Sequence, residues 1–532
     1  MSAATRVIGD EPAGDVRLEA PAWDGRNTGS VRAIRLMMVI ALPLTLLYFA
    51  WLLQPGRVGN PLLYGVLVAA ELFNLVQAAG FWWTTARQAV RPHVALPEGG
   101  TPPRVDVFVP VYGEPVEVVE PTITAAQGMQ GARVTVFLLD DGDDPAMLAL
   151  AERHGARYVR RARHEGAKAG NINHALGLTS APYVVVFDCD HVPDARFLEA
   201  TLGHFGEDER LAFVQTPQYY ANATQGRIQA ASWAQQALFF GAIARGKDGH
   251  GAMFCAGTNV VFRRAALDAA GGFPEGPLTE DFELSVALHA GGWHSAYVPE
   301  VLARGLGPED MASYVSQQQR WARGCLSASR ATLRARLPLR VRAQYLLSSM
   351  YFLTGWTVLV YMAMPIIRIT TGAQPLNGST ADQFLLHFAP YFGWALLTVS
   401  IAGAGSYTFG AFALQSASFW IHIQATILTL LGRRGTFVVT PKRGRAERQL
   451  RPVWPALAML ALLVAAALWG LHRGVSPGNL NNVAFAVLHI VVLLSGVWAA
   501  LVPPRAAAAA GAAGEAGLGD RRRPVPPERL VA

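Results

Sequence analysis

Six long apolar runs, two before and four after a charged central stretch, constrain the fold more than any other feature of this 532-residue chain. Each run is about long enough to cross a bilayer as one helix, which takes roughly 20 apolar residues. The composition agrees, because 52% of the residues are hydrophobic and only 16% are charged. The sequence therefore predicts a multi-pass membrane protein with a folded domain between its second and third spans. The runs occupy residues 36–53, 62–83, 345–367, 384–403, 454–471 and 483–502.

A further apolar segment, residues 409–431, is interpreted as lying in the membrane interface. It carries polar side chains such as Gln415, His422 and Gln424, which make it amphipathic. If it crossed the membrane, the basic segment 433–451 would lie opposite the central domain, against the preference of Lys and Arg for the cytoplasmic side. An interfacial helix avoids this conflict. Six spans then place both termini and the central domain in the cytoplasm, at the inner (plasma) membrane.

The charge and the cysteine content limit which partners and which cysteine-based sites the chain can have. The net charge of +7 comes from basic residues that cluster beside the apolar runs, which favours a lipid bilayer over nucleic acid as the partner. The three cysteines have no CxxC spacing, so neither a disulfide framework nor a zinc site is predicted. The chain is predicted to divide into a cytoplasmic N-terminal segment (1–35), two spans (36–86), the central domain with interfacial helices (100–340), two spans (345–403), an interfacial helix and loop (405–451), two spans (454–502) and a disordered tail (503–532).

The central domain alternates predicted strands and helices, which indicates an α/β fold with a largely parallel sheet. Strands are expected in "VDVFVPVYGEP", "RVTVFLLDDGDD", "APYVVVFDCDHVP" and "RLAFVQTPQYY", and helices in "AMLALAERHG" and "GNINHALGL". Ligands bind at the carboxyl ends of the strands in such sheets. Two predicted strands end in paired carboxylates, so their acidic ends are expected to meet where a ligand would lie.

The acidic strand ends are Asp140-Asp141 and Asp188-Cys189-Asp190. Two carboxylates one residue apart suit a hard divalent cation, Mg²⁺ or Mn²⁺, which is usually held by one or two carboxylates together with substrate phosphates. A solvated turn would explain the same pattern. Lys168, in "HEGAKAGNINHAL", lies between the two acidic ends in sequence. It is either a point charge beside a diphosphate or an ordinary solvated lysine.

Two later motifs also have a structural and a functional interpretation. Thr279-Glu280-Asp281 begins an amphipathic stretch, where these residue types commonly cap a helix and favour its dipole. Gln317 and Arg320 share one face of a predicted helix, and Trp321 lies four residues from Gln317. Trp beside Arg is typical of a membrane-interface anchor, or of a flat platform for a sugar ring beside a cation for phosphate.

In this order, the DDG, DxD, TED and Q-x-x-R-W motifs resemble those of the processive family 2 glycosyltransferase synthases, most of all the catalytic subunit of bacterial cellulose synthase. The blocks "HEGAKAGNINHAL", "VVVFDCDHVP", "FVQTPQYYAN", "MFCAGTNVVFRRAALDAAGGF", "LTEDFELSVALHAGGW" and "FVVTPK" resemble that family as well. With the flanking spans, the resemblance covers residues 35–500. It implies a GT-A type catalytic domain inserted between transmembrane helices.

The resemblance also implies a role for each matching residue. Asp281 is then the general base that deprotonates the acceptor hydroxyl. Asp188 and Asp190 hold the diphosphate of a UDP-sugar donor through Mg²⁺ (or Mn²⁺). The remaining donor residues are implied to be Asp140, Asp141, Lys168 and Arg320. Acceptor contacts are implied for Cys255, Gln317 and Trp321, and a gating loop over UDP for Phe437, Val439, Thr440 and Lys442.

The expected activity is therefore processive, inverting transfer of glucose from UDP-glucose to a growing β-glucan chain, β-1,4-linked as in cellulose, with export through the spans. A β-1,3 or mixed linkage, or a UDP-N-acetylglucosamine donor, stays open, because no motif describes the sugar pocket. Single transfer to a lipid and a transporter role are weaker alternatives. An extracytoplasmic accessory protein is a further expected partner. Unlike most cellulose synthases, the sequence shows no further N-terminal pair of spans and no C-terminal PilZ domain, so regulation by cyclic di-GMP is not expected.

Overall fold

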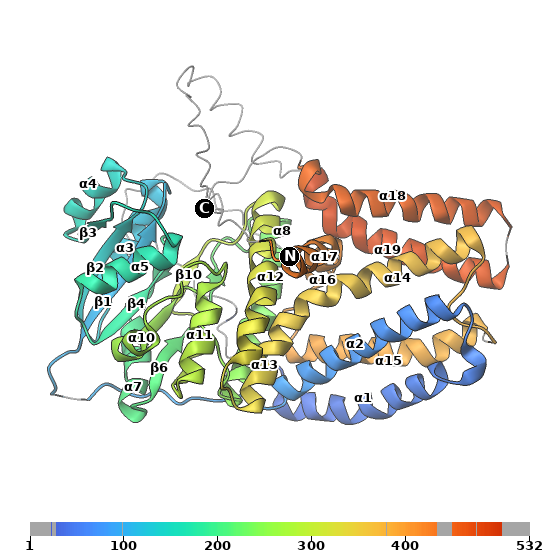
Figure 1. Ribbon diagram of the computed structural model, residues 1–532, viewed down its shortest axis with the longest axis horizontal. Coiled ribbons are helices and arrows are strands. Elements are labelled where there is room, and N and C mark those ends of the chain that lie inside the picture. The colour runs from blue at the N-terminus through green and yellow to red at the C-terminus, as the bar shows by residue number, and fades with distance from the viewer. Residues whose placement is uncertain are drawn as a thin grey trace, which may run out of the picture.

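The computed structural model describes residues 23, 28–97, 99–378, 380–433, 449–474 and 476–502. In Figure 1 an α/β domain lies on the left and a bundle of long helices on the right, with α12 (Met311–Arg334) and α13 (Leu339–Met350) between them. The charged central stretch of the sequence thus forms the domain, and the apolar runs form the bundle. The predicted insertion of one into the other is confirmed.

The α/β domain is built on a seven-stranded sheet with the order β3-β2-β1-β4-β8-β6-β9. Strands β3, β2, β1 and β4 are parallel, as are β6 and β9, whereas β8 is antiparallel to both of its neighbours. The predicted largely parallel sheet is therefore a mixed one, because β8 enters in the opposite direction. The strands are β1 (Arg104–Val111), β2 (Arg133–Asp140), β3 (Arg157–Arg160), β4 (Tyr183–Val186), β6 (Leu211–Gln215), β8 (Val260–Arg263) and β9 (His294–Tyr297).

Helices cover both faces of this sheet, which explains why its strands are continuous apolar runs rather than alternating ones. In β1, Val107 and Val109 face one buried cluster, which also contains Ile123 of α3, while Phe108 faces another that contains Ile172 of α5. The helices of the domain are α3 (Val116–Gln127), α4 (Pro145–His154), α5 (Ala167–Leu178), α6 (Phe197–Leu202), α7 (His204–Glu207), α10 (Arg264–Ala270) and α11 (Glu280–Ala290). A small second sheet pairs β5 (Val192–Pro193), β10 (Ala303–Gly305) and β7 (Tyr219–Tyr220).

Six helical segments of the described chain are long and apolar enough to cross a membrane, as the sequence predicted. They are α1 (Val31–Leu52), α2 (Pro61–Thr85), the run Leu339–Thr371, α15 (Ala381–Ala402), α18 (Leu450–His472) and α19 (Pro477–Leu501). The third of these joins α13 to α14 (Thr354–Thr371) through a turn of 3-10 helix, η3 (Tyr351–Leu353), and another such turn, η1 (Pro55–Arg57), follows α1. A bundle of such segments is the architecture of a multi-pass membrane protein.

The segment interpreted as interfacial forms two short helices, α16 (Phe409–Ala417) and α17 (Phe419–Leu430), separated at Ser418. At 9 and 12 residues, neither is long enough to cross a bilayer alone. They pack against α8 (Arg227–Leu238), α12 and α14. With α8, the π-helical turn η2 (Phe239–Ile243) and α9 (Ala244–Gly249), they form the junction between the α/β domain and the bundle.

Candidate active site

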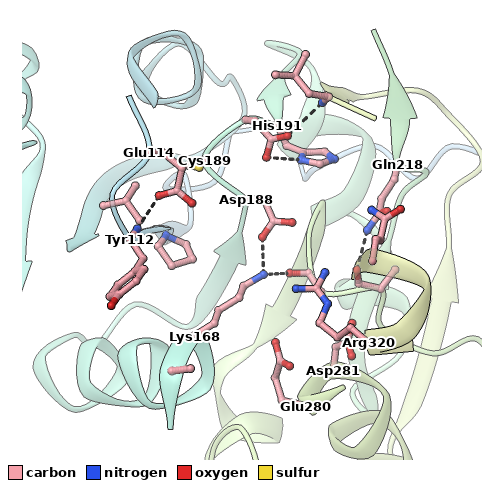
Figure 2. A pocket seen from close by; sticks show the side chains of 18 of the residues that line it. Tyr112, Glu114, Lys168, Asp188, Cys189, His191, Gln218, Glu280, Asp281 and Arg320 are labelled. Carbon is pink, nitrogen blue, oxygen red and sulfur yellow. Dashed lines mark hydrogen bonds and ion pairs between the residues drawn. The ribbon is translucent and has the colours of Figure 1, made fainter. Parts of the chain in front are cut away.

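A cavity of about 740 Å³ lies beyond the carboxyl ends of β1, β2 and β4, where it meets the first turns of α11 and the middle of α12. Figure 2 shows acidic and basic side chains from these separate elements directed toward one another. Eight of the sequence-predicted residues line it: Asp141, Lys168, Asp188, Asp190, Asp281, Gln317, Arg320 and Trp321. The acidic strand ends therefore meet as expected, and the later motifs complete the same cavity.

At the end of β2, the two adjacent aspartates differ in what they contact. Asp140 is fully buried, and its carboxylate accepts hydrogen bonds from the backbone N–H groups of Gly142 (2.6 Å) and Asp144 (2.9 Å) and from the Tyr158 hydroxyl (2.8 Å). It is not among the residues that line the cavity. Asp140 thus shapes the turn, and its expected contact with the nucleotide falls to Asp141.

Asp141 lines the cavity and forms a buried bidentate ion pair with Arg161. The guanidinium donates from Nε and Nη2 to the two carboxylate oxygens over 2.7 and 2.6 Å, and from Nη1 and Nη2 to the carbonyls of Glu165 and Ala167. Planar pairing of this kind fixes the orientation of a carboxylate. Arg161 was not predicted from sequence, because it follows β3 and meets Asp141 only through the pairing of β2 with β3.

At the end of β4, Asp188 is paired with Lys168 of α5. The ammonium Nζ lies 2.5 Å from Asp188 Oδ1 and donates to the carbonyl of Gly257 over 2.7 Å (Figure 2). Burial lowers the pKa of Lys168, but the attraction of Asp188 and Glu280 outweighs this effect and leaves the pKa above its ordinary value. Lys168 is therefore a fixed cation of the site rather than a solvated lysine.

Asp188, Asp190 and His191 form a cluster. Each offers one atom that could bind a metal, and these three atoms lie within 4.8 Å of one another. His191 is 5% exposed, and its Nε2 has no hydrogen-bond partner among the described residues. Its ring lies against the backbone of Gly305 in β10, where a Cβ would come within 2.4 Å of it. Sequence reasoning missed His191, although its place directly after the DxD pair at a strand end was the available signal.

The charge of the cavity fits a divalent cation at this cluster. Asp188, Asp190, Glu280 and Asp281 line it, against the cations Lys168 and Arg320. An excess of carboxylates in a partly dry site is unfavourable unless a cation or protons offset it. Two carboxylates with an unpartnered imidazole nitrogen are a suitable donor set for a divalent metal. The residues present therefore fit the Mg²⁺ or Mn²⁺ that the sequence predicted.

Asp281 lies in the first turn of α11. Burial, and next the charge of Glu280, raise the pKa of Asp281 from 3.8 to about 7. Thr279 stands at the start of this helix but makes no capping hydrogen bond, so the capping interpretation of this residue is wrong. Its side chain instead lies against Gly324 of α12, where a Cβ would come within 2.3 Å. Close packing of α11 on α12 thus replaces the cap.

Helix α12 brings its three motif residues to the cavity. The helix begins after Asp310, whose carboxylate accepts from the backbone N–H of Ser313 over 2.8 Å. The Oε1 atom of Gln317 is buried and has no hydrogen-bond partner among the described residues. Trp321 lines the cavity and packs against a buried cluster that contains Phe352 of η3 and Ala425 of α17. The indole therefore lies where the cavity meets the junction helices.

Residues 183–498 match the family model "Glycosyl transferase family group 2", which covers more than half of the chain. The chain belongs to this glycosyltransferase family. Most of the residues that line the cavity lie within the match, as do the last four membrane helices except for the end of α19. The predicted family 2 resemblance is confirmed.

Two curated relatives match a larger share of the chain than the family model does. "Cellulose synthase 2" of Novacetimonas hansenii is 32% identical over 488 residues, which are 86% of this chain but 30% of that protein. "Cellulose synthase catalytic subunit [UDP-forming]" of Pseudomonas fluorescens (strain SBW25) is 30% identical over 460 residues, 83% of this chain and 62% of that protein. This chain thus spans less than two thirds of the length of either relative.

Among solved structures, a mannosyltransferase from Pyrobaculum calidifontis, in complex with GDP-Man and Mn²⁺, superposes with a TM-score of 0.52. The match covers 70% of this chain and 99% of that one, at 16% identity. At this identity the likeness concerns the fold alone. It confirms the expected GT-A type of glycosyltransferase fold for the α/β domain.

The remaining predicted residues of this glycosyltransferase lie elsewhere. Cys255 is 1% exposed and is not among the residues that line the cavity; its backbone N–H donates to Ser285 of α11 over 2.8 Å. It supports the helix that carries Asp281 rather than facing the cavity. The four residues assigned to a gating loop, Phe437, Val439, Thr440 and Lys442, lie outside the described residues.

Proposed function

We propose that this chain is a processive, inverting membrane glycosyltransferase that polymerises glucose from UDP-glucose into a β-1,4-linked, cellulose-like glucan and moves the polymer across the membrane. The observation that carries the proposal is the convergence of Asp141, Asp188, Asp281 and Arg320, from four separate elements, on one cavity next to the membrane helices. The names of the relatives, which are cellulose synthases, support the product.

Asp281 is the proposed general base. An inverting transfer needs one group that removes the acceptor hydroxyl proton as the anomeric carbon is attacked, and no second carboxylate as a nucleophile. A base works best when its pKa lies near the pH of the cytoplasm, and that of Asp281 is raised to about 7, above all by burial. The place of Asp281 in the first turn of α11 directs it into the cavity between the strand ends and α12.

The departing UDP would be stabilised by fixed cations. Lys168 of α5 and Arg320 of α12 both line the cavity and lie near each other in Figure 2, so charge that develops on the diphosphate would meet two cations. Asp141, held by Arg161, presents its outer lone pairs to the nucleotide. A Mg²⁺ or Mn²⁺ ion held by Asp188, Asp190 and His191 would neutralise the diphosphate when bound.

The acceptor would enter from the side of α12. Trp321 offers a flat apolar face for a terminal sugar ring, and Gln317 offers a sugar hydroxyl an amide oxygen that has no hydrogen-bond partner in the part of the chain that the structure describes. Cys255, which packs beneath α11, would act only through that helix. Because Trp321 also packs against a cluster that contains Phe352, part of the membrane-spanning run Leu339–Thr371, a chain lengthened at this point would already lie next to the bundle.

The orientation follows from the charge of the chain. A catalytic domain that uses UDP-glucose would face the cytoplasm, which is also the side that basic sequence such as segment 433–451 prefers. The growing polymer would leave through the helices of the plasma membrane toward an extracytoplasmic accessory protein.

The test uses the full chain in nanodiscs with Mg²⁺, given radiolabelled UDP-glucose or UDP-N-acetylglucosamine separately. Asp281→Asn is expected to make no polymer, whereas Asp268→Asn, an exposed aspartate on α10, should behave as the wild type. A polymer from UDP-glucose that β-1,4-glucanase degrades would support the proposal. A product cut only by β-1,3-glucanase would show that the proposed linkage is wrong. A polymer made only from UDP-N-acetylglucosamine would show that the proposed donor is wrong. No polymer from either donor, with UDP still bound, would contradict polymerisation and favour a lipid acceptor.

A further inference from the structure

Helix α11 carries a row of buried polar residues that no part of the proposed reaction uses directly. Ser285 and His289 follow Asp281 at intervals of four residues, which places all three along one face of the helix. Ser285 is fully buried, and His289 is 7% exposed. The Ser285 hydroxyl donates to the carbonyl oxygen of Asp281 over 2.8 Å and accepts from the backbone N–H of Cys255.

His289 links this row to a membrane helix. Its Nδ1 lies 2.8 Å from the hydroxyl oxygen of Tyr345 in α13, and its Nε2 lies 3.0 Å from Ser295 Oγ in β9. Ser295 donates its own proton to the carbonyl of Met253, so it must accept from His289. The ring proton is therefore on Nε2, and Nδ1 accepts from Tyr345. Burial lowers the pKa of His289 to about 4, which agrees with a neutral ring.

Tyr345 contacts α11 at both ends of the helix. Besides its hydrogen bond to His289 in the last turn, its ring packs edge-on against Phe282 in the first turn, with ring centroids 5.1 Å apart. Phe282 is the residue after Asp281, and its backbone N–H donates to Asp281 Oδ1 over 2.7 Å. Tyr345 itself is 1% exposed and belongs to the membrane-spanning run Leu339–Thr371. One side chain of a membrane helix thus contacts α11 in both its first and its last turn.

We propose that His289 and Tyr345 are positioning residues, whose hydrogen bond fixes α11 along its axis against α13 and so fixes the place of the Asp281 carboxylate in the cavity. The inference rests on the proposed function only in that Asp281 is the base. Misplacing a reacting group by about 1 Å can lower a rate roughly 100-fold. The proposed donor contacts Asp141, Lys168 and Asp188 stand outside α11, so loosening α11 should slow the reaction without weakening the binding of UDP.

The test is Tyr345→Phe in the full chain in nanodiscs. The substitution keeps the ring against Phe282 and leaves His289 Nδ1 without its donor. We expect kcat, measured as UDP release per folded molecule, to fall about 10- to 100-fold. The Kd for UDP should change less than about twofold, because its contacts are untouched. A kcat equal to that of the wild type, or a parallel loss of UDP affinity, would overturn the proposal.

Two substitutions of His289 separate positioning from a general loss of stability. The amide oxygen of an Asn can replace Nδ1 as the acceptor for Tyr345, whereas the amide of a Gln reaches only the place of Nε2. His289→Asn should therefore keep more of the wild-type kcat than His289→Gln. Tyr297→Phe is the matched control, because its buried hydroxyl donates to the carbonyl of Phe240 rather than to α11. It should lower thermal stability and leave kcat unchanged; equal kcat losses in all of these variants would refute positioning.

Failure of the inference and failure of the proposed function give different results. If Asp281→Asn turns over at the wild-type rate, the base assignment is wrong. If Asp281→Asn is inactive while Tyr345→Phe is fully active, only the positioning role is wrong. Hydrogen exchange of the α11 amides provides a readout without turnover: it should become faster in Tyr345→Phe and not in Tyr297→Phe, because the lost bond frees α11 alone. Unchanged exchange would contradict the proposal even if the wild type does not use UDP-glucose.

Discussion

Removing the charge of Glu280 tests how the cavity raises the pKa of Asp281, the proposed base. Glu280 lines the cavity beside Asp281 (Figure 2), and its negative charge is the second cause, after burial, of the raised pKa of Asp281. That pKa stands at about 7 rather than 3.8, so the increase is about three pH units. The charge of Glu280, the second cause after burial, should account for about one pH unit of this increase. Glu280→Gln should therefore lower the pKa of Asp281 to about 6.

The direction of the pH effect follows from the proposed role of Asp281 as the base. A base acts in its deprotonated form, so activity is present above its pKa and lost as the pH falls through it. At pH 6 the wild type, with a pKa of about 7, should keep about one eleventh of its plateau value of kcat/KM, and Glu280→Gln about one half. The relative activity at pH 6 should thus rise about fivefold.

The assay measures initial rates of UDP release between pH 5.5 and 8.5 at saturating Mg²⁺, with each variant normalised to its own plateau. Glu283→Gln is the matched control, because it makes the same change on the same helix but lies outside the cavity and does not contribute to the pKa of Asp281. Its acid limb should coincide with that of the wild type. If the limb of Glu280→Gln stays in place or moves to higher pH, the electrostatic account of this base is refuted.

Three further perturbations address the rest of the cavity. Arg161→Met leaves Asp141 buried without its partner and should lower the free energy of unfolding, measured by denaturation, by about 3–5 kcal/mol. It should also weaken UDP binding, measured by calorimetry. An unchanged free energy of unfolding would contradict this prediction. Gly305→Ala places a Cβ within 2.4 Å of the His191 ring and should raise the Mg²⁺ concentration needed for half-maximal activity, whereas Gly177→Ala, where a Cβ meets nothing within 4 Å, should not. Removing divalent cations with EDTA should abolish turnover until Mg²⁺ or Mn²⁺ is restored, and activity that persists in EDTA would exclude a metal requirement.

The sequence pattern at the start of α11 predicted that Thr279 caps the helix, and the structure shows a different role for this side chain. A Ser, Thr or Asp at a helix start commonly caps the helix, yet Thr279 makes no such bond and fills the notch that Gly324 leaves on α12. The pattern describes what a residue can do locally. The partner helix decided what it does here.

Adjacent residues at a strand end show the same limit. Asp140 and Asp141 have the same chemistry, but successive side chains of a strand point to opposite sides. One carboxylate therefore holds the turn after β2 while the other lines the cavity. Arg161, which follows the neighbouring strand, then fixes Asp141. No spacing rule in the sequence relates these residues, because the pairing of β2 with β3 brings them together.

The amino-acid sequence was sufficient to predict the six apolar helices, the strands of the domain that end in carboxylates, and the order of motifs from Asp141 to Trp321. These features depend on local physics: the thickness of a bilayer sets the length of an apolar run, and burial on both faces makes a strand continuously apolar. Tertiary structure alone decided that β8 runs antiparallel and that His191 joins the two aspartates. The same packing places the Tyr345 hydroxyl of a membrane helix 2.8 Å from His289 Nδ1 in α11. These outcomes depend on contacts between residues far apart in the chain, which only the packing of sheet, junction helices and bundle brings together.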